Sequence, residues 1–319
     1  MNSLLARFAE NSYWMARYVE RAENLARIVD VNSSFARDAQ GANDWLPIIK
    51  LNVDEERFFE RYREADASNV VRFYIIDTDN PNSIVSSVRA ARENARSIRH
   101  LISLETWTQL NVFYNWVKSL TPRSLNASEL SRVCARIKEG CQTHSGIVTG
   151  TFYRDQVWSF YRLGTFSELC DQITRLVDIK YHALLPSWRD VGTPVDIAQW
   201  NALLRSASAY HGYRRVYPTE MTPATVAGFI LLDPRLPRSI HHCVRHLEMT
   251  LDELLARDEL RHVVFPRGSL DTLKELASRV PKEVVAAGLH EYLDEVQLAL
   301  LDFGGQINGT FFKAEEQAA

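Results

Sequence analysis

Residues 13–31 read YWMARYVERAENLARIVDV, and residues 161–179 read YRLGTFSELCDQITRLVDI. The two stretches align at a constant shift of 148 residues, which pairs Glu20 with Glu168. A second pair of stretches, residues 73–89 and 229–245, aligns at a shift of 156 residues. Two matches in the same order predict a tandem duplication, with about eight residues inserted between the blocks of the second copy.

Apolar residues in both copies are spaced three and four apart, which is typical of helices rather than strands. Glycine (13) and proline (11) are sparse among 319 residues, so long helices can form. We therefore predict an all-α fold, a helical bundle built from two tandem repeats related by a pseudo-twofold axis. The expected repeats are residues 1–148 and 149–319, sharing one core.

The two longest predicted helices cover about residues 4–34 and 152–184, one in each copy. In each copy a proline, followed two residues later by a serine, precedes another helix, so Ser83 and Ser239 are expected to cap helices. The remaining predicted helices cover about 43–64, 104–120, 127–147, 194–213, 268–279 and 282–304. Connections are expected at Gln40-Gly41, 119–124 and 191–194, and a frayed tail at 313–319.

The overall composition excludes several classes of protein. A formal charge of −3 gives no basic surface for nucleic acid, and no apolar stretch approaches the roughly 20 residues that span a membrane. Arg7 and Glu10 interrupt any signal-peptide apolar region, so we expect a cytoplasmic protein. The four cysteines are scattered, which predicts neither a disulfide framework nor a zinc ribbon: Cys134, Cys141, Cys170 and Cys243.

The first long helix concentrates polar residues on a quarter to a third of its circumference, at about 100° per residue. These residues are Glu10, Arg17, Glu20, Arg21 and Asn24. Tyr13 and Ile28 share the same arc, so some of the charges are expected to be buried between helices. Because buried charges need partners, the pattern predicts an interhelical ion-pair network, which is either structural or part of a functional site.

A second set of charges follows Pro81. Arg89, Glu93, Arg96 and His100 are spaced four, three and four apart and form a narrow stripe, flanked by Arg92 and Arg99. One glutamate cannot neutralise four arginines, and planar guanidinium groups suit a carboxylate, a phosphate or an acidic helix of a partner. A solvated helix face with internal pairs is the alternative interpretation.

Comparison of the two copies separates these residues into two groups. Glu20, Arg27 and Arg89 are kept as Glu168, Arg175 and Arg245, so we expect them to serve architecture that both copies share. The other residues change, which favours a single asymmetric site in the first half: Arg17 to Thr165, Arg21 to Leu169, Asn24 to Gln172, Glu93 to Met249, Arg96 to Asp252 and His100 to Ala256.

Enzyme signatures are scarce: the sequence has no P-loop, Rossmann fingerprint, HExxH, nucleophile elbow or paired CxxC. His242 and His246 could face one metal ion, but no third ligand is identifiable, so no metal site is predicted. Cys141 and His144 lack an orienting group for nucleophilic catalysis. Four aromatic residues are interpreted as core packing: Trp107, Phe113, Tyr114 and Trp116.

The context RFAENSYWMARYVERAENLARIVDVN around Glu20-Arg21 resembles the bacterial alpha-E domain family, named for an all-helical domain with a glutamate-arginine motif. The resemblance covers nearly the full length, through residues 80–107, Gly150-Thr151 and residues 231–240, and the family typically shows the same duplication. The second occurrence of the motif departs from the pattern and reads Glu168-Leu169, which argues against a function that requires two intact motifs.

The resemblance implies a component of a peptide synthesis or modification system that contains circularly permuted ATP-grasp ligases, a transglutaminase-like protein and an N-terminal-nucleophile hydrolase. An ATP-grasp partner would supply nucleotide and metal, so no cofactor is expected on this chain. Three functions follow. The chain is an accessory protein that docks the ligase or its peptide substrate, an enzyme of the pathway in which Glu20 is the acid or base and Arg21, Arg89 and Arg96 orient a carboxylate, or a structural bundle or homo-oligomer.

Overall fold

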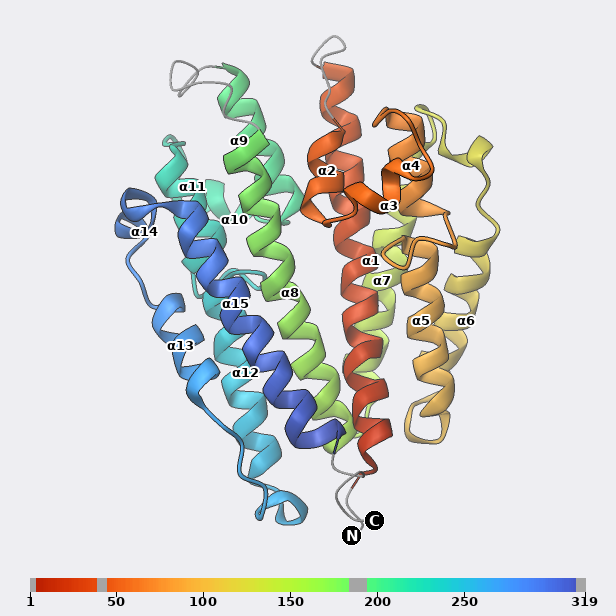
Figure 1. The fold of residues 1–319 in the computed structure, drawn as a ribbon, viewed down its shortest axis with the longest axis vertical. Helices are drawn as coiled ribbons and strands as arrows, with labels where there is room; N and C mark the ends of the chain where they lie inside the picture. The colour runs from red at the N-terminus through yellow and green to blue at the C-terminus, as the bar shows by residue number, and fades with distance from the viewer. Residues whose placement is uncertain (1–3, 39–44, 184–193, 314–319) are drawn as a thin grey trace. The chain divides into compact units, whose positions relative to one another are not determined.

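The computed structural model describes residues 4–38, 45–183 and 194–313, and all regular secondary structure in them is helical, as predicted. Contacts divide the chain into two compact units. The first, here called the N-unit, comprises residues 14–153, and the second, the C-unit, comprises residues 1–13 and 154–319. Helix α1 (Ala6–Asp38) therefore begins in the C-unit and continues in the N-unit (Figure 1).

The N-unit is built from the greater part of α1 and six further α-helices. These are α2 (Leu46–Leu51), α3 (Glu55–Phe59), α4 (Ala67–Ile75), α5 (Ile84–Ser97), α6 (Leu104–Lys118) and α7 (Leu130–Thr151), with short 3-10 turns η1 (Arg99–Leu101) and η2 (Pro122–Leu125). Helix α5 packs against α6, and α6 packs against α7. Helix α7 is tied to α1 by an ion pair of 2.6 Å between Lys138 Nζ and Asp30 Oδ2.

The C-unit contains eight described α-helices besides the start of α1. These are α8 (Gln156–Ala183), α9 (Pro194–Ser206), α10 (Tyr210–Val216), α11 (Pro223–Leu232), α12 (Ile240–Leu255), α13 (Gly268–Ala277), α14 (Pro281–Ala287) and α15 (Leu289–Ile307), with a 3-10 turn η4 (Asp258–Leu260) and a π-helical turn η5 (Asn308–Phe312). Helix α8 packs against α12 and α15, and α13 packs against the same two helices (Figure 1).

The first residues of α1 complete the core of the C-unit. The Ser12 hydroxyl donates to the Val157 carbonyl oxygen at 2.7 Å, and the ring of Tyr13 lies 5.6 Å from that of Phe312. Gly164 of α8 allows this close approach, because a methyl group there would overlap the Tyr13 carbonyl oxygen. The amino-terminal segment is thus part of a helical core formed mainly by residues far along the chain.

Three predicted helices are wrong in extent, because the structure divides each of them in two: 43–64, 194–213 and 282–304. At each division one residue has a positive φ, which interrupts the helical hydrogen bonding. These residues are Val53 (53°), Ser208 (57°) and Gly288 (126°). Valine and serine do not favour this conformation, so their residue type does not predict the breaks at Val53 and Ser208.

The two predicted helix caps are confirmed. Ser83 Oγ accepts a hydrogen bond from the Ser86 amide at 3.2 Å, and its hydroxyl donates to the Asp77 carbonyl oxygen at 2.6 Å. Ser239 Oγ likewise accepts from the amide of His242 at 3.1 Å and donates to the carbonyl oxygen of Asp233 at 2.7 Å. In each unit the serine therefore joins the start of a helix to the loop before it.

Other local conformations also recur in the two units. A cluster of three aromatic rings forms in each, from Phe58, Tyr62 and Phe73 in the N-unit and from Tyr213, Tyr217 and Phe229 in the C-unit. The paired positions differ by 155 or 156 residues, close to the shift seen in the sequence. These recurrences support the tandem duplication, which stays a prediction together with its pseudo-twofold axis.

No helix within the described residues has the length and apolar character that a membrane crossing requires. The four cysteines are buried, and none of them forms a disulfide among the described residues. A cytoplasmic location stays a prediction. Three other predictions lie wholly or partly outside the described residues: the connection at Gln40-Gly41, most of the connection at 191–194, and the tail after Lys313.

Candidate functional site

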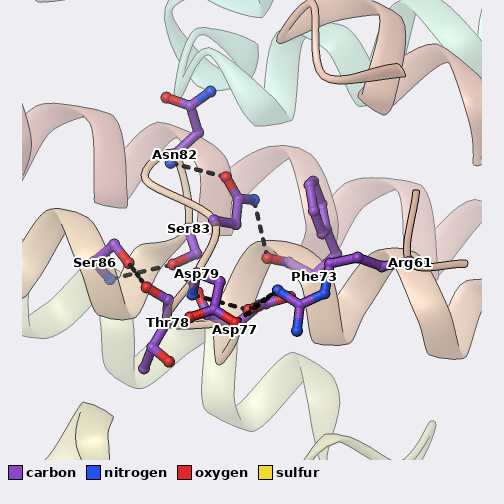
Figure 2. Close-up of polar contacts among 9 residues, drawn as sticks. Arg61, Phe73, Asp77, Thr78, Asp79, Asn82, Ser83 and Ser86 are labelled. Carbon is purple, nitrogen blue, oxygen red and sulfur yellow. Dashed lines mark hydrogen bonds and ion pairs between the residues drawn. The ribbon is translucent and has the colours of Figure 1, made fainter. Parts of the chain in front are cut away.

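A polar loop, residues 77–83, fixes the start of helix α5. Arg61 Nη1 donates to Asp77 Oδ1 and to Asp79 Oδ2, both at 3.0 Å, and the Asn80 side-chain amide donates to the Phe73 carbonyl oxygen at 3.0 Å. Figure 2 shows the Arg61 guanidinium beside Asp77 and Asp79, and Ser83 is the residue that precedes α5. The loop thereby holds α5 in place relative to α4.

A buried carboxylate also anchors the loop of residues 77–83. Asp54, which is 1% exposed, accepts hydrogen bonds from Arg57 Nη1 at 2.7 Å, from Asn82 Nδ2 at 3.0 Å and from the Tyr74 hydroxyl at 3.2 Å. Burial raises the pKa of the Asp54 carboxyl, and burial is also the main cause that raises the pKa of Tyr74. Because the carboxylate already has three donors, we interpret this network as an anchor for α3, α4 and the loop.

The Asp54 network was not predicted, although the repeat in the sequence contains a signal for it. At a shift of 155 or 156 residues the four positions read Ala209, Gly212, Ile230 and Arg238. The network is therefore specific to the first half. Extending the comparison of the two copies beyond the two aligned blocks would have identified it.

The predicted stripe forms a surface that we call the arginine ridge, defined as Arg89, Arg92, Glu93, Arg96, Arg99 and His100. Four of these residues are exposed, while Arg92 and Glu93 are half-buried. Glu93 Oε1 accepts from Arg92 Nη1 at 2.7 Å, and Glu93 Oε2 lies 2.6 Å from Arg96 Nη2. Arg89 and Arg99 form no ion pair with any residue that the structure describes. The ridge therefore keeps a net positive charge.

Helix α6 supports the ridge with aromatic and amide side chains. Arg92 Nε donates to Asn111 Oδ1 at 2.7 Å, and its guanidinium lies 5.4 Å from the ring centroids of both Trp107 and Tyr114. The Arg99 guanidinium lies 5.4 Å from the Trp107 ring as well. Stacking on aromatic rings restrains the arginines while leaving their outer N–H groups available to a ligand.

These contacts correct the interpretation of the α6 aromatic residues as core. Only Phe113 is buried, at 5% exposure, whereas Trp107, Tyr114 and Trp116 are half-buried. Trp107 and Tyr114 are seven residues apart, so both lie on the side of α6 that faces α5, where arginines cover them. The spacing of apolar residues alone does not distinguish a ring packed in a core from one covered by a guanidinium.

The glutamate-arginine motif lies in α1, within the N-unit. Glu20 and Asn24 are buried, with 6% and 5% exposure, as expected for polar residues that share an arc with large apolar ones. Arg17 and Arg21 are half-buried, and their guanidiniums lie over the rings of residues three positions earlier, Trp14 at 4.8 Å and Tyr18 at 5.5 Å. The site residues predicted on α1 thus combine a buried acid with restrained, partly accessible cations.

Other residues of α1 form ion pairs, while the network expected for Glu20, Arg17 and Arg21 stays a prediction. Glu23 is 2% exposed, and its Oε1 accepts from Arg27 Nη2 at 2.5 Å and from Gln142 Nε2 of α7 at 3.3 Å. In the C-unit, Arg175 Nε donates to Asp171 Oδ2 at 2.9 Å, the same i,i+4 arrangement. A pair that recurs in both units supports the prediction that Arg27 serves shared architecture.

The two histidines once considered as metal ligands make other contacts. His246 Nδ1 lies 2.8 Å from Arg162 Nη2, and its ring stacks on that of Phe166 with centroids 4.6 Å apart. Burial and the neighbouring cations, including Arg162, lower the pKa of His246 to about 4. No group of three or more His, Cys, Asp or Glu side chains that could hold a metal ion occurs among the described residues.

Cys141 and His144 lie within α7 and are both fully buried. His144 Nδ1 lies 3.2 Å from Gln109 Oε1, a contact between α7 and α6. Burial lowers the pKa of His144 to about 4, so this imidazole is neutral at physiological pH. These contacts favour a structural role for the pair.

Comparison with known proteins places these features in a family. The profile of the Alpha-E family, described as a predicted alpha-helical domain with a conserved ER motif, matches residues 4–312. Uncharacterised proteins of Mycobacterium bovis and Mycobacterium tuberculosis are 26% identical over 268 residues, which cover 78% of this chain and 30% of each relative. The chain thus spans less than a third of the length of these curated relatives. No solved structure matches.

Proposed function

The chain belongs to the Alpha-E family, and from this premise we propose that it is a non-catalytic, partner-binding protein of a peptide synthesis or modification system. Its arginine ridge docks an ATP-grasp-type ligase or the peptide substrate of that ligase. The ligase supplies nucleotide, metal and chemistry, and a transglutaminase-like protein is a second candidate partner. The resemblance stated above supports the identity of these partners.

The observation that carries the proposal is the uncompensated charge of the arginine ridge. Glu93 forms ion pairs with both Arg92 and Arg96. Exposed ion pairs of this kind contribute only about 0.2–1 kcal/mol to stability, so an acidic partner can replace them at little cost. Arg89, Arg96 and Arg99 remain exposed on one helix face and the turn that follows it. Guanidinium groups in such a row recognise carboxylates through paired N–H donors, as an acidic helix or peptide would present them.

The enzyme alternative receives less support. An active site needs its groups to converge on a concave pocket. Three grooves on the described surface are lined by residues of α6, η2 and α7 or of α13 and α15, and neither Glu20 nor any ridge residue lines them. The ridge is an exposed helix face, which suits a macromolecular partner better than a small substrate.

A pull-down from native cytosol, with and without ATP, tests the proposal. Tagged wild type is compared with the Arg89→Ala/Arg96→Ala double variant and with Arg63→Ala/Arg215→Ala, which removes the same charge from exposed positions outside the ridge. We expect an ATP-grasp ligase to be recovered by wild type and by the control but not by the ridge variant, and recovery to fall as salt increases. A ligase that binds neither version and works fully without this chain would refute the proposal.

A further inference from the structure

Two helix pairs, one in each unit, leave open grooves with the same spacing of lining residues. On α6 and α13 the lining includes residues at i, i+3, i+4 and i+7, beginning at Gln109 and Thr272. On α7 and α15 the same spacing begins at Arg136 and Glu295. The grooves have similar volumes, about 340 and 350 Å³, so they offer comparable space to a docking surface.

The α6–α7 groove is basic where it approaches η2. It continues toward η2 into a second hollow of about 470 Å³ that shares Trp116 and Arg136 with the first. Within this hollow Arg132 is paired with Glu129, which leaves Arg123 and Arg136 without an ion-pair partner in the part of the chain that the structure describes. The Arg136 guanidinium is held over the Trp116 ring at 4.4 Å. Glu139 lines the α6–α7 groove itself, outside this hollow, and carries the opposite charge.

The α13–α15 groove is acidic. Arg279 Nη1 and Glu295 Oε2 form an ion pair of 2.9 Å across it. Glu275 and Asp302, both exposed in the lining, make no ion pair with the residues described in the structure. The hollow toward η2 and the α13–α15 groove therefore each contain one internal ion pair and two uncompensated charges of one sign, positive in the N-unit and negative in the C-unit.

Exposed apolar side chains line both the α6–α7 groove and the α13–α15 groove. Val112 of α6 is 65% exposed and Leu298 of α15 is 64% exposed. Large apolar residues exposed beside a groove, with charged residues around them, are typical of protein interaction sites. Burying both in one interface would add a hydrophobic contribution to the electrostatic one.

We propose that the α6–α7 groove of one copy of the chain docks against the α13–α15 groove of a second copy, so that the protein associates head to tail. Arg123 and Arg136 of one copy then face Glu275 and Asp302 of the next. A second copy is favoured as the occupant because the basic hollow and the acidic groove each supply the charge that the other lacks. A contact between two different surfaces leads to a closed ring or an open chain of subunits. The arginine ridge on α5 has no part in it.

Charge reversal on each side tests the proposal. The basic groove is reversed with Arg123→Glu/Arg136→Glu and the acidic groove with Glu275→Arg/Asp302→Arg, and neither change breaks an ion pair within the described structure. Sedimentation velocity is recorded from micromolar to submillimolar concentration, with helicity checked by circular dichroism. Arg63→Glu/Arg215→Glu, which reverses two exposed arginines outside both grooves, is the control.

We expect wild type and the control to show concentration-dependent association, and each groove variant alone to associate at least about tenfold more weakly, because like charges then face each other. An equimolar mixture of the two variants should associate again, since the reversed grooves are complementary to one another. A wild type that stays monomeric throughout overturns the proposal. So does a mixture that stays monomeric while wild type associates, or a groove variant that associates as wild type does.

Discussion

At Val53 the backbone adopts a left-handed conformation, with φ of 53°, that β-branched residues rarely occupy. The side chain is 77% exposed, so packing does not compensate for the unfavourable backbone. The residue that follows is the buried Asp54, and the unusual conformation ends α2 and positions that carboxylate at the start of α3. Single residues of this kind decide where helices break.

Replacing Val53 with glycine should therefore stabilise the protein. Removing the left-handed strain gains about 1–2 kcal/mol, and the greater freedom of glycine in the unfolded chain offsets about half of it, for a net gain of about 0.5–1 kcal/mol. Urea unfolding measures the change. Val264→Gly, at a position 88% exposed with a negative φ, is the control and should be neutral or slightly destabilising. A lower free energy of unfolding for Val53→Gly than for wild type would contradict the proposed backbone strain at Val53.

The buried His144 predicts a loss of stability in mild acid. Its pKa is lowered to about 4 in the folded protein, while it is 6.5 in an unfolded chain, so the unfolded state binds the proton more readily. The contribution of His144 is therefore present above pH 6.5 and is lost as the pH falls toward 4. The loss should reach about 3 kcal/mol.

Unfolding free energies between pH 7 and pH 4 check this dependence on His144. His144→Asn should be less stable at neutral pH and should show a flatter slope over that range. His246→Asn should flatten the slope less, because His246 is partly exposed and its charge is screened by solvent. Equal slopes in wild type and His144→Asn would show that the imidazole does not titrate as proposed.

At the scale of helices, the N-caps of α5 and α12 could be predicted from the sequence, but several interruptions of predicted helices could not. The Pro-x-Ser pattern predicted the starts of α5 and α12, because a serine hydroxyl at an N-cap accepts a hydrogen bond from a free backbone amide. This capping is a local property of the residue. The breaks at Val53 and Ser208 occur at left-handed backbone conformations that valine and serine do not favour, so the residue types give no signal for them. The stripe on α5 was predicted from its spacing, but its partners on α6 were not, because one helix does not show which neighbour covers it.

Removing either cap should have a similar effect. Ser83→Ala and Ser239→Ala each delete a bond to a helix amide and a bond to a loop carbonyl oxygen, so each should cost about 1–2 kcal/mol. Thermal unfolding compares them with Ser97→Ala, at an exposed serine near the end of α5 that should change stability little. If one cap variant were neutral, the recurrence of the motif would not reflect equal local energetics.

Substitutions of two helical glycines test whether the close contact between α1 and α8 is correct. Gly164→Ala places a methyl group against the Tyr13 carbonyl oxygen, so the backbone must shift, at a cost of about 3 kcal/mol. Gly146→Ala, in α7, meets nothing within 4 Å and should stabilise the helix by about 0.5–1 kcal/mol. Denaturant midpoints of the two variants should move in opposite directions, and movement in the same direction would contradict the contact at Tyr13.

At the scale of the whole molecule, residues 4–13 belong to a different unit from the rest of their helix. A chain that begins at Trp14 should lose the Ser12 and Tyr13 contacts, so amide hydrogen exchange should accelerate in α8 and η5. Exchange in α5 and α6 should change little, which provides an internal control. Acceleration in α5 and α6 equal to that in α8 would show that the two units do not unfold separately.

The repeat in the sequence predicted two similar halves, but it did not predict this exchange of the first residues. Aligned blocks begin at Tyr13, and nothing in the ten residues before it shows which half they join. The all-helical class was predictable because helical spacing is a local property. The assignment of the amino-terminal residues was not, because it depends on contacts 145–152 positions away in the chain.

The same segment has a consequence for the order in which the protein matures on the ribosome. Residues 4–13 emerge well before their neighbours in α8 and η5, which are translated about 145 to 299 residues later. Until then the apolar side of this segment, including Tyr13, has no core to enter. Closing such a long loop is a slow step in folding. The N-unit can form before η5 is translated, whereas the core of the C-unit cannot close until η5 has left the ribosome.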